Sequence, residues 1–449
     1  MTGPARSNLF YQTGNPRPVL DRALGIHMWD TTGRRFIDGS SGAMVCNIGH
    51  SNPAVLAAMQ AQMAKSTFGY RLHFVTEAAE ALAARTAALA WPEMDRVFFV
   101  SGGSEAVESA IKLARQYAVA VGQPGRWKVI SRHPSYHGCT LGALAVTGYD
   151  PLTLPFAPMM QAMPKIAAPT AWADGRDPDD PATGACYAGL LEARILAEGA
   201  DTVLAFLVEP IGGAATGALV PPAGYMRAVR DIYDRHGVLL IHDEVMSGGG
   251  RTGRFFAGRH WDAAPDILAV SKGFGAGYVP LGAMLARGDI VDAVMQAGGF
   301  LHGFTYAGNP LACATGLAVI DEIERQDLMG NATRTGGYLK AQMTGLMDRF
   351  AFIGEVRGMG LLLAMEFVAD RHTRAPLPPA LNAHERVVEA AYARGLILYS
   401  RRTRGGVAGD HVMVCPPMIT TPPQVDDIIA RLADALTAFA SEASLPVAA

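Results

Sequence analysis

The 449-residue chain lacks the features that mark membrane, secreted and disulfide-bonded proteins. No stretch approaches about eighteen uninterrupted apolar residues, so the sequence predicts no membrane span. Residues 1–18 are polar and contain proline and glycine, without the apolar core of a signal peptide. The five cysteines are odd in number and have no Cys-x-x-Cys spacing, which argues against a disulfide framework and a zinc site. We therefore expect reduced thiols in a cytoplasmic protein.

Charge is scarce as well, and several binding motifs are missing. The net charge of −3 gives no reason to expect a nucleic-acid partner. His133 and His137 are spaced four apart, but no acidic pattern accompanies them, so no metal site is predicted. No lysine follows a glycine, which excludes a Walker A loop. No Gly-x-Gly-x-x-Gly follows the first strand, which disfavours a nucleotide-binding oxidoreductase.

Only six lysines occur, and one of them, Lys272, ends a predicted strand. It follows the apolar run 267–270 and precedes a glycine-rich turn at 273–277. Asp243 ends a similar run 29 positions earlier (272 − 243). Neighbouring strands can place an ammonium and a carboxylate at one sheet edge, where they could hold a pyridine aldehyde at both ends. The alternative, a buried salt bridge between them, would be costly without a function.

The middle of the chain alternates between strand and helix patterns. The predicted strands are almost entirely apolar, as is typical of a mostly parallel sheet buried on both faces; they cover 97–100, 127–131, 203–208, 238–241, 267–270 and 281–285. Helices are predicted at 54–63, 77–89, 104–120, 311–326, 332–350, 383–394 and 423–440, with a strand-rich stretch at 356–367 and a loop at 371–379. The early strand at 35–38 has no partner in this sheet, so we expect it to pair with the C-terminal part.

Four further clusters carry functional residues, and each has a purely structural alternative. Ser101-Gly102-Gly103-Ser104 precedes a helix and suits either a phosphate cradle or an N-cap. Tyr136 follows a strand and suits either ring stacking or the core. Glu209 comes at the end of the strand at 203–208. It suits either a functional position near Asp243 or a solvent-exposed strand end. Thr305 in the loop 303–310 offers a hydroxyl for phosphate.

In this order and on strand ends, the clusters resemble class III aminotransferases, pyridoxal-phosphate enzymes of fold type I. The resemblance runs from about Asp38 to the C-terminus. It is most specific from His242-Asp243-Glu244-Val245 through Gly250-Arg251-Thr252-Gly253 to Ser271-Lys272-Gly273. The resemblance implies an α/β fold with a large domain, a mostly parallel seven-stranded sheet flanked by helices, plus a smaller α+β domain from both chain ends. We expect the small domain at 1–60 and 331–449 and the large domain at 61–330.

The resemblance also implies roles for the matched residues. Lys272 would bond covalently to the aldehyde of pyridoxal 5'-phosphate and carry protons, and Asp243 would pair with the pyridine nitrogen. The partner subunit of a homodimer, or of a tetramer, would contribute Thr305 to the phosphate site. The remaining cofactor residues would pack on the ring, hold the phosphate or lie beside Asp243; they are Gly103, Ser104, Tyr136, His137, Glu209 and Val245.

Departures from the family bear on the substrate. Three charged positions of the branch resembling ornithine, acetylornithine and 4-aminobutyrate aminotransferases are uncharged here: Cys139, Ala214 and Met413. That argues against glutamate and ornithine as substrates. Gly409-Asp410-His411 instead resembles the amine–pyruvate branch.

In that branch a mobile arginine binds the acceptor carboxylate. Arg401, Arg402 and Arg404 are the candidates, and Arg404 is preferred. Met44 and Tyr70 are expected to line the amine pocket, with Phe68 and Arg71 near it. The sequence thus predicts transfer of an amino group from an amine or ω-amino acid to a small 2-oxo acid such as pyruvate. A decarboxylase or aminomutase relative would share the cofactor residues, and a regulatory or structural protein could have kept the fold without catalysis.

Overall fold

Apolar runs form the central sheet of the protein, a computed structural model that describes residues 8–11, 14, 17–261 and 263–448. The sheet has seven strands in the order β4-β10-β9-β8-β7-β5-β6, and β10 alone runs antiparallel to its two neighbours. These strands are β4 Arg96–Val100, β5 Lys128–His133, β6 Lys165–Ala167, β7 Val203–Val208, β8 Leu239–Asp243, β9 Ile267–Val270 and β10 Gly282–Ala286. The expected mostly parallel seven-stranded sheet is confirmed, and six of its strands coincide with predicted runs to within a few residues.

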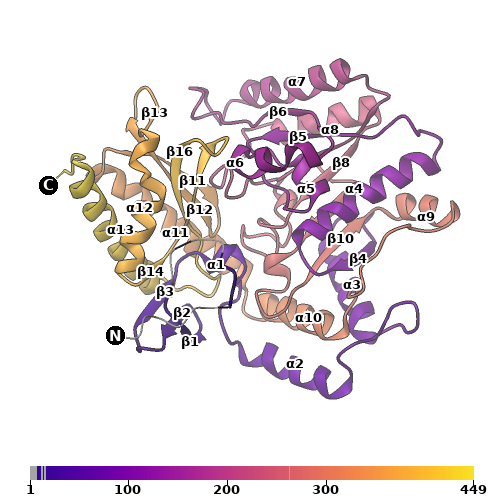
Figure 1. Cartoon of the computed structure of the whole chain (residues 1–449), viewed down its shortest axis with the longest axis horizontal. Helices are drawn as coiled ribbons and strands as arrows, with labels where there is room; N and C mark the ends of the chain where they lie inside the picture. The colour runs from indigo at the N-terminus through magenta and orange to yellow at the C-terminus, as the bar shows by residue number, and fades with distance from the viewer. Residues whose placement is uncertain (1–7, 12–13, 15–16, 262, 449) are drawn as a thin grey trace.

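Helices cover both faces of this sheet because successive side chains of a strand point to opposite faces. On β7, Leu207 packs with the core under α4 (Gly103–Ala120) and α9 (Gly288–Gln296). Its neighbour Phe206 packs with α7 (Pro181–Glu198) and α8 (Tyr225–His236) on the other face. The layered arrangement places the sheet between two sets of helices (Figure 1).

The two ends of the chain meet in the smaller part of the molecule. β1 (Leu20–Leu24), β2 (His27–Asp30) and β3 (Arg35–Asp38) form a sheet with β14 (Leu396–Ile397), which pairs parallel to β3. The expected pairing of the early strand with the C-terminal part is therefore confirmed. A second sheet has the order β11-β12-β16-β15, with helices beside it (Figure 1). Its elements are β11 Ile353–Met359, β12 Leu362–Asp370, β15 Tyr399–Arg404, β16 Ala408–Val414, α11 Leu328–Arg349, α12 Ala383–Ala393 and α13 Pro422–Ala443.

Both predicted domain boundaries fall inside helices. Residue 60 lies within α2 (Pro53–Lys65), which packs on α10 (Pro310–Arg325) of the large part. Residue 330 lies within α11, which begins at Leu328 after Asp327 adopts a positive φ of 48°. Because a domain boundary belongs between packed elements, we propose boundaries near 52 and 327 instead.

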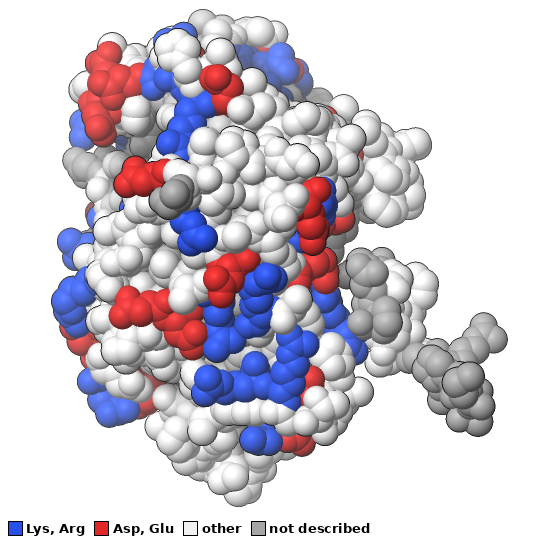
Figure 2. All heavy atoms as spheres, turned by 90° about the vertical axis from the view of Figure 1, so that its left-hand side faces the viewer, with Lys and Arg blue, Asp and Glu red and all other residues white. Residues whose placement is uncertain are grey.

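The remaining segments are short. The loop predicted at 371–379 contains β13 (Ala375–Pro376), which pairs with β12. The other short helices are α1 Ser41–Met44, α5 Leu141–Val146 and α6 Asp150–Thr153, and α3 spans Glu77–Leu89 as predicted. Among the described helices, none has the length and apolarity needed to cross a membrane. On the face shown in Figure 2, lysine and arginine side chains lie beside aspartates and glutamates. Arg431 pairs with Asp427 on α13, and Arg386 of α12 pairs with Glu442 of α13.

Candidate active site

The carboxyl ends of three neighbouring parallel strands bring three ionisable side chains to one sheet edge. Glu209 follows β7, Asp243 ends β8, and Lys272 follows β9 after Ser271. The register places Asp243 opposite Ala269, three residues before Lys272. Lys272 adopts a positive φ of 48° at the start of the glycine-rich turn. This juxtaposition is the one that the strand pattern predicts.

The Lys272 ammonium is half-buried near these acids. Among the described residues, no carboxylate lies within 4.0 Å of it and none accepts a hydrogen bond from it. Burial lowers the pKa of Lys272 to about 8, although the nearby carboxylates of Asp243 and Glu209 act in the opposite direction. The alternative of a Lys272–Asp243 salt bridge is therefore wrong for this structure. A primary amine with this pKa is neutral often enough at neutral pH to act as a nucleophile or a base.

Asp243 is held by two other groups. Nδ1 of His137 lies 2.8 Å from its Oδ2, and the backbone N–H of Val245 donates to its Oδ1 over 3.0 Å. Both side chains of the His137–Asp243 pair are almost fully buried. The backbone N–H of His137 in turn donates to Thr147 Oγ1 over 2.9 Å. The structure thus gives His137 a definite task, which is to fix the orientation of the Asp243 carboxylate.

Glu209 has one hydrogen-bonded oxygen and one that is paired only loosely, with Arg132 Nη2 4.0 Å from its Oε2. The backbone N–H of Gly213 donates to its Oε1 over 2.8 Å, whereas its buried Oε2 has no hydrogen-bond partner among the described residues. Burial raises the pKa of Glu209, and the nearby His137 and Arg132 counteract this. Glu209 is 4% exposed and interacts electrostatically with Asp243, so the alternative of a solvated strand-end acid is wrong.

The turn before α4 is a place where an anion could be held. The helix begins at Gly103, its N-cap Gly102 supplies no side-chain cap, and Ser104 lies inside the first turn, so the N-cap alternative for Ser104 is wrong. Ser104 Oγ instead accepts from the backbone N–H of Cys139 over 3.0 Å. A Cβ on Gly103 would lie only 2.7 Å from Val245 Cγ1, so this backbone approaches the end of β8 closely. Free N–H groups at a helix N-terminus favour phosphate.

Tyr136 stands beside this turn, half-buried. Burial raises its pKa, with Cys139, Tyr399 and Asp243 acting in the same direction, whereas Arg401 lowers it. The β15–β16 hairpin therefore brings Tyr399 and Arg401 close to Tyr136. In the same hairpin, Arg401 also lies over the Tyr399 ring at 4.9 Å.

The other two candidate arginines are engaged elsewhere. Arg402 donates to the carbonyl of Pro379 over 2.7 Å and lies 3.4 Å from the buried Asp410. Arg404 is exposed and donates to the carbonyl of Arg374 over 2.9 Å. Alternate residues of β15 point to opposite sides, so Arg401 shares a side with Tyr399, and Arg402 and Arg404 share the other.

Three predicted residues make no hydrogen bond with Lys272, Asp243 or Glu209 among the described residues. Met44 is 1% exposed and packs in an apolar cluster with Met413, Leu362 and the partly buried Ala214. Tyr70 is half-buried in the loop before α3. Thr305 is exposed in the loop before α10.

Arg251, which lies in the motif at 250–253, is a buried residue to which the sequence assigns no role. It is fully buried, and its Nη1 donates to the carbonyls of Leu361, Cys415 and Pro416, each over 3.1 Å. Its Nη2 donates to Asn47 Oδ1 over 2.6 Å. A Cβ on Gly273 would lie 2.1 Å from Asn47 Nδ2, so Asn47 packs directly on the turn that carries Lys272. Arg251 thereby links the smaller part of the molecule to the lysine turn. The sequence indicates its importance only by its position between Gly250 and Gly253 of the motif.

Comparison with known proteins agrees with this geometry. The family described as aminotransferase class-III matches residues 11–436. The chain belongs to the class III aminotransferases. It is 36% identical over 425 residues to the uncharacterised aminotransferase YodT of Bacillus subtilis, covering 94% of this chain and 95% of that protein. It is 32% identical over 414 residues to the putrescine–pyruvate aminotransferase of Pseudomonas aeruginosa, covering 92% and 88%.

A solved structure matches this class III aminotransferase over nearly its full length. The amine transaminase from an uncultivated Pseudomonas species, in its pyridoxal-phosphate-bound form, superposes with a TM-score of 0.90. It is 36% identical, and the match covers 97% of this chain and 99% of that one. The enzyme is a pyridoxal-phosphate-dependent transaminase of fold type I.

The residues present fit the cofactor. Among the described residues Lys272 has no ion-pair partner, and each Asp243 oxygen has one partner and can accept a further hydrogen bond from a pyridine N–H; the uncapped start of α4 suits the phosphate. When bound, pyridoxal phosphate supplies the electron sink that stabilises negative charge on the substrate carbon.

Proposed function

We propose that this transaminase moves an amino group from an uncharged amine or ω-amino acid to a small 2-oxo acid such as pyruvate, in two successive half-reactions. The observation that carries the proposal is the apolar cluster beside Glu209. Met44, Ala214 and Met413 all belong to it, and the last two stand where a dicarboxylate-handling site would carry charge. A Cβ on Gly213 would lie 2.9 Å from Glu209 Oε1 and 2.8 Å from Met246 Sδ of the same cluster. This cluster offers no charged side chain to pair with a second carboxylate, which favours uncharged donor groups.

The catalytic roles follow from the positions of the ionisable groups. Lys272 would hold the cofactor and, as a free amine, would remove the proton from the substrate carbon and deliver a proton in the reverse half-reaction. Asp243, oriented by His137, keeps the pyridine nitrogen protonated. Glu209 lies beside them with one oxygen available for a hydrogen bond.

Arg401 is the arginine that we propose for the acceptor carboxylate, in place of Arg404. Its electrostatic influence reaches Tyr136, and among the described residues its guanidinium contacts only the Tyr399 ring and the carbonyl of Ser400, 3.3 Å away. A loosely held guanidinium can turn towards a carboxylate when one is present and away when the donor is uncharged. Arg402 and Arg404 would first have to leave other partners.

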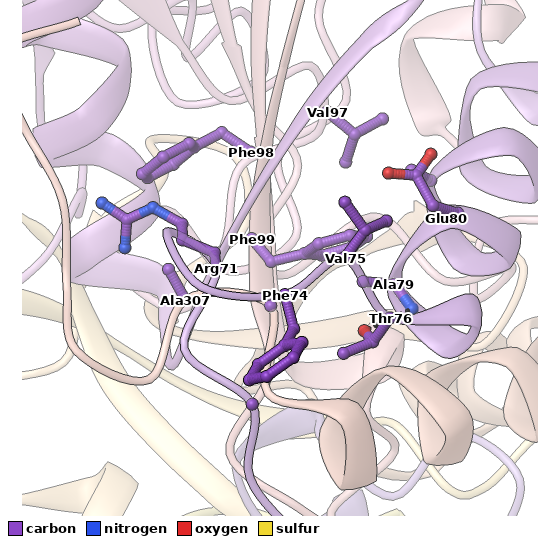
Figure 3. Close-up of a pocket in the computed structure, with 13 residues that line it drawn as sticks. Arg71, Phe74, Val75, Thr76, Ala79, Glu80, Val97, Phe98, Phe99 and Ala307 are labelled. Carbon is purple, nitrogen blue, oxygen red and sulfur yellow. Dashed lines mark hydrogen bonds between the residues drawn. The ribbon is translucent and has the colours of Figure 1, made fainter.

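A homodimer completes the site in this proposal. The loops around Arg71 and Thr305 expose large apolar side chains: Leu72, Phe74, Val75, Leu301 and Tyr306. Figure 3 shows Phe74, Val75 and Phe98 around a cavity of about 220 Å³ beside Ala307. Arg71 Nη1 donates to the carbonyl of Phe304 over 2.9 Å and joins the two loops. An exposed apolar patch of this kind favours a protein partner, and a second copy would bring Thr305 to a neighbouring phosphate site.

The five free thiols support a cytoplasmic location.

The testing experiment is a donor screen with the pyridoxal-phosphate-loaded enzyme. Monoamines, diamines and ω-amino acids are each incubated with pyruvate or 2-oxoglutarate, and alanine, glutamate and carbon dioxide are quantified. Alanine formed in equal amount to the carbonyl product, without carbon dioxide, supports the proposal. Release of carbon dioxide from an amino acid, or isomerisation of the donor without any acceptor, would instead assign a decarboxylase or an aminomutase.

A further inference from the structure

A second group of ligand-type side chains lies in the turn between β3 and α2. Asp38, Cys46 and His50 each bring one potential ligand atom to the same place, and these atoms all lie within 4.8 Å of one another. His50 Nε2 lies 2.9 Å from Asp38 Oδ2. The three residues are separated by eight and four positions, which matches no familiar ligand spacing. They converge because the chain folds back at α1, where Gly42 adopts a φ of 67°.

We propose that Asp38, Cys46 and His50 form a site for one Zn²⁺ ion per chain, with water as the fourth ligand. A thiolate, an imidazole and a carboxylate are the donor types that zinc accepts, and a tetrahedral ion would space them about 3.3 to 3.8 Å apart. The Cys46 and His50 residues are half-buried, so their side chains can adjust and solvent can reach the ion.

The carboxylate is already oriented for this task. Asp38 is 1% exposed, and its Oδ1 accepts from the backbone N–H of Gly42 over 3.0 Å and of Ser40 over 3.3 Å. Its Oδ2 is thereby directed at His50. The backbone of His50 is fixed as well, because its N–H donates to Gly25 over 2.8 Å. Such supporting hydrogen bonds are characteristic of metal ligands.

The proposed site touches the lysine turn. A Cβ on Gly277 would lie 3.0 Å from Cys46 Sγ, and Tyr278 donates its hydroxyl hydrogen to the carbonyl of Gly49 over 3.1 Å. Both Gly277 and Tyr278 belong to the chain segment that follows Lys272. An ion bound at Cys46 would therefore sit against the segment that positions the catalytic amine.

Titration with zinc chloride tests the proposal on the cofactor-loaded enzyme. We expect one Zn²⁺ per chain by calorimetry and by metal analysis after gel filtration. Cys46→Ser, which leaves the Asp38–His50 contact in place, should bind at least about tenfold more weakly. Cys186→Ser removes an exposed thiol on α7 and should bind as the wild type does. Equal zinc affinity of Cys46→Ser and wild type would overturn the site.

Cobalt gives a second measurement that needs only the wild-type chain. Co²⁺ bound to Cys46 should show a thiolate charge-transfer band and the visible bands of a tetrahedral ion. Zinc should also protect Cys46, but not Cys186, from alkylation by iodoacetamide, as mapped by peptide mass. A cobalt complex without the sulfur band, or alkylation of Cys46 unaffected by zinc, counts against the proposal even where Cys46→Ser fails to fold.

Discussion

Nδ1 of His137 lies 2.8 Å from Oδ2 of Asp243, although the two residues are 106 positions apart in the chain. In the sheet, β5 and β8 are both neighbours of β7, and this arrangement brings the loop after β5 to the end of β8. The contact leaves Oδ1 of Asp243 to the backbone of Val245 and fixes the plane of the carboxylate. A carboxylate that must hold a pyridinium proton depends on such fixing.

Replacement of His137 should therefore lower kcat without emptying the cofactor site. A hydrogen bond to a charged group contributes about 1.5 to 3 kcal/mol, so His137→Leu should reduce kcat about tenfold to a hundredfold. His137→Asn, whose amide nitrogen can take the place of Nδ1, should recover part of the loss. The visible absorbance of the bound cofactor, titrated against pH, should shift in the leucine variant and return in the asparagine variant. Equal losses in both variants would point to a packing role only.

The lowered pKa of Lys272 predicts how fast the enzyme without cofactor takes up pyridoxal phosphate. Only the neutral amine attacks the aldehyde, and burial places the pKa of Lys272 at about 8. Below pH 8 the uptake rate should fall about tenfold per pH unit, and above it the rate should level off. Stopped-flow absorbance on the cofactor-free enzyme measures this profile. Lys272→Ala should show no covalent uptake, and a rate still rising steeply above pH 9 would disagree with the proposed environment.

Shared active sites would make two damaged chains complement each other. Thr305→Glu places a carboxylate against the phosphate, and Lys272→Ala removes the amine, so each homodimer should be inactive. In a mixed dimer, the Thr305→Glu chain keeps its own Lys272 and receives the intact Thr305 of the other chain. Random pairing should restore about a quarter of all sites. Activity that stays at the level of the parent variants after co-expression would mean that Thr305 serves its own subunit.

Stability should respond to acid through a buried histidine beside the site. His242 is fully buried, packs on Trp91 and has no partner at either ring nitrogen among the described residues. Burial lowers its pKa from 6.5 to about 3, so the folded chain keeps it neutral while the unfolded chain protonates it below pH 6.5. The wild type therefore loses stability as pH falls from 6.5 to 3.

Replacement of His242 by leucine removes this loss. The free energy of unfolding of His242→Leu, relative to wild type, should rise by about 1.4 kcal/mol per pH unit as pH falls from 6.5 towards 5. Urea unfolding at several pH values measures the difference. His411, whose pKa burial likewise lowers to about 3, should give a parallel result as His411→Leu. A difference in the free energy of unfolding between variant and wild type that stays constant over this pH range would refute the lowered histidine pKa.

The sheet edge could be predicted because parallel, fully buried strands leave a strong local signal. Runs such as β7 and β9 are apolar at every position, and their carboxyl ends fix where Glu209 and Lys272 lie. The three-residue β6 has too little sequence to show a pattern, and it was missed. Helix α11 begins four residues before its predicted start because Asp327 in a left-handed conformation, not a capping side chain, opens it.

Contacts between distant segments left no local signal. The reach of Arg251 to Asn47 and to Cys415 depends on how the smaller part sits against the lysine turn. The convergence of Asp38, Cys46 and His50 depends on one folded-back turn. Spacing along the sequence does not choose among the three candidate arginines, whereas the side of β15 on which each arginine lies is decided by pairing with β16.

The arginine assignment can be decided by kinetics with two acceptors. Arg401→Ala removes the guanidinium that lies near Tyr136, so the KM for pyruvate should rise about tenfold to a hundredfold, the worth of a hydrogen bond to a charged group. With a small aldehyde as acceptor, which has no carboxylate, kcat/KM should stay close to wild type. The matched control is Arg404→Ala, which removes a guanidinium that donates to the carbonyl of Arg374. This variant should leave both values unchanged. The opposite pattern, with pyruvate affinity lost in Arg404→Ala and kept in Arg401→Ala, would return the role to Arg404 and require the hairpin to turn over when the acceptor binds.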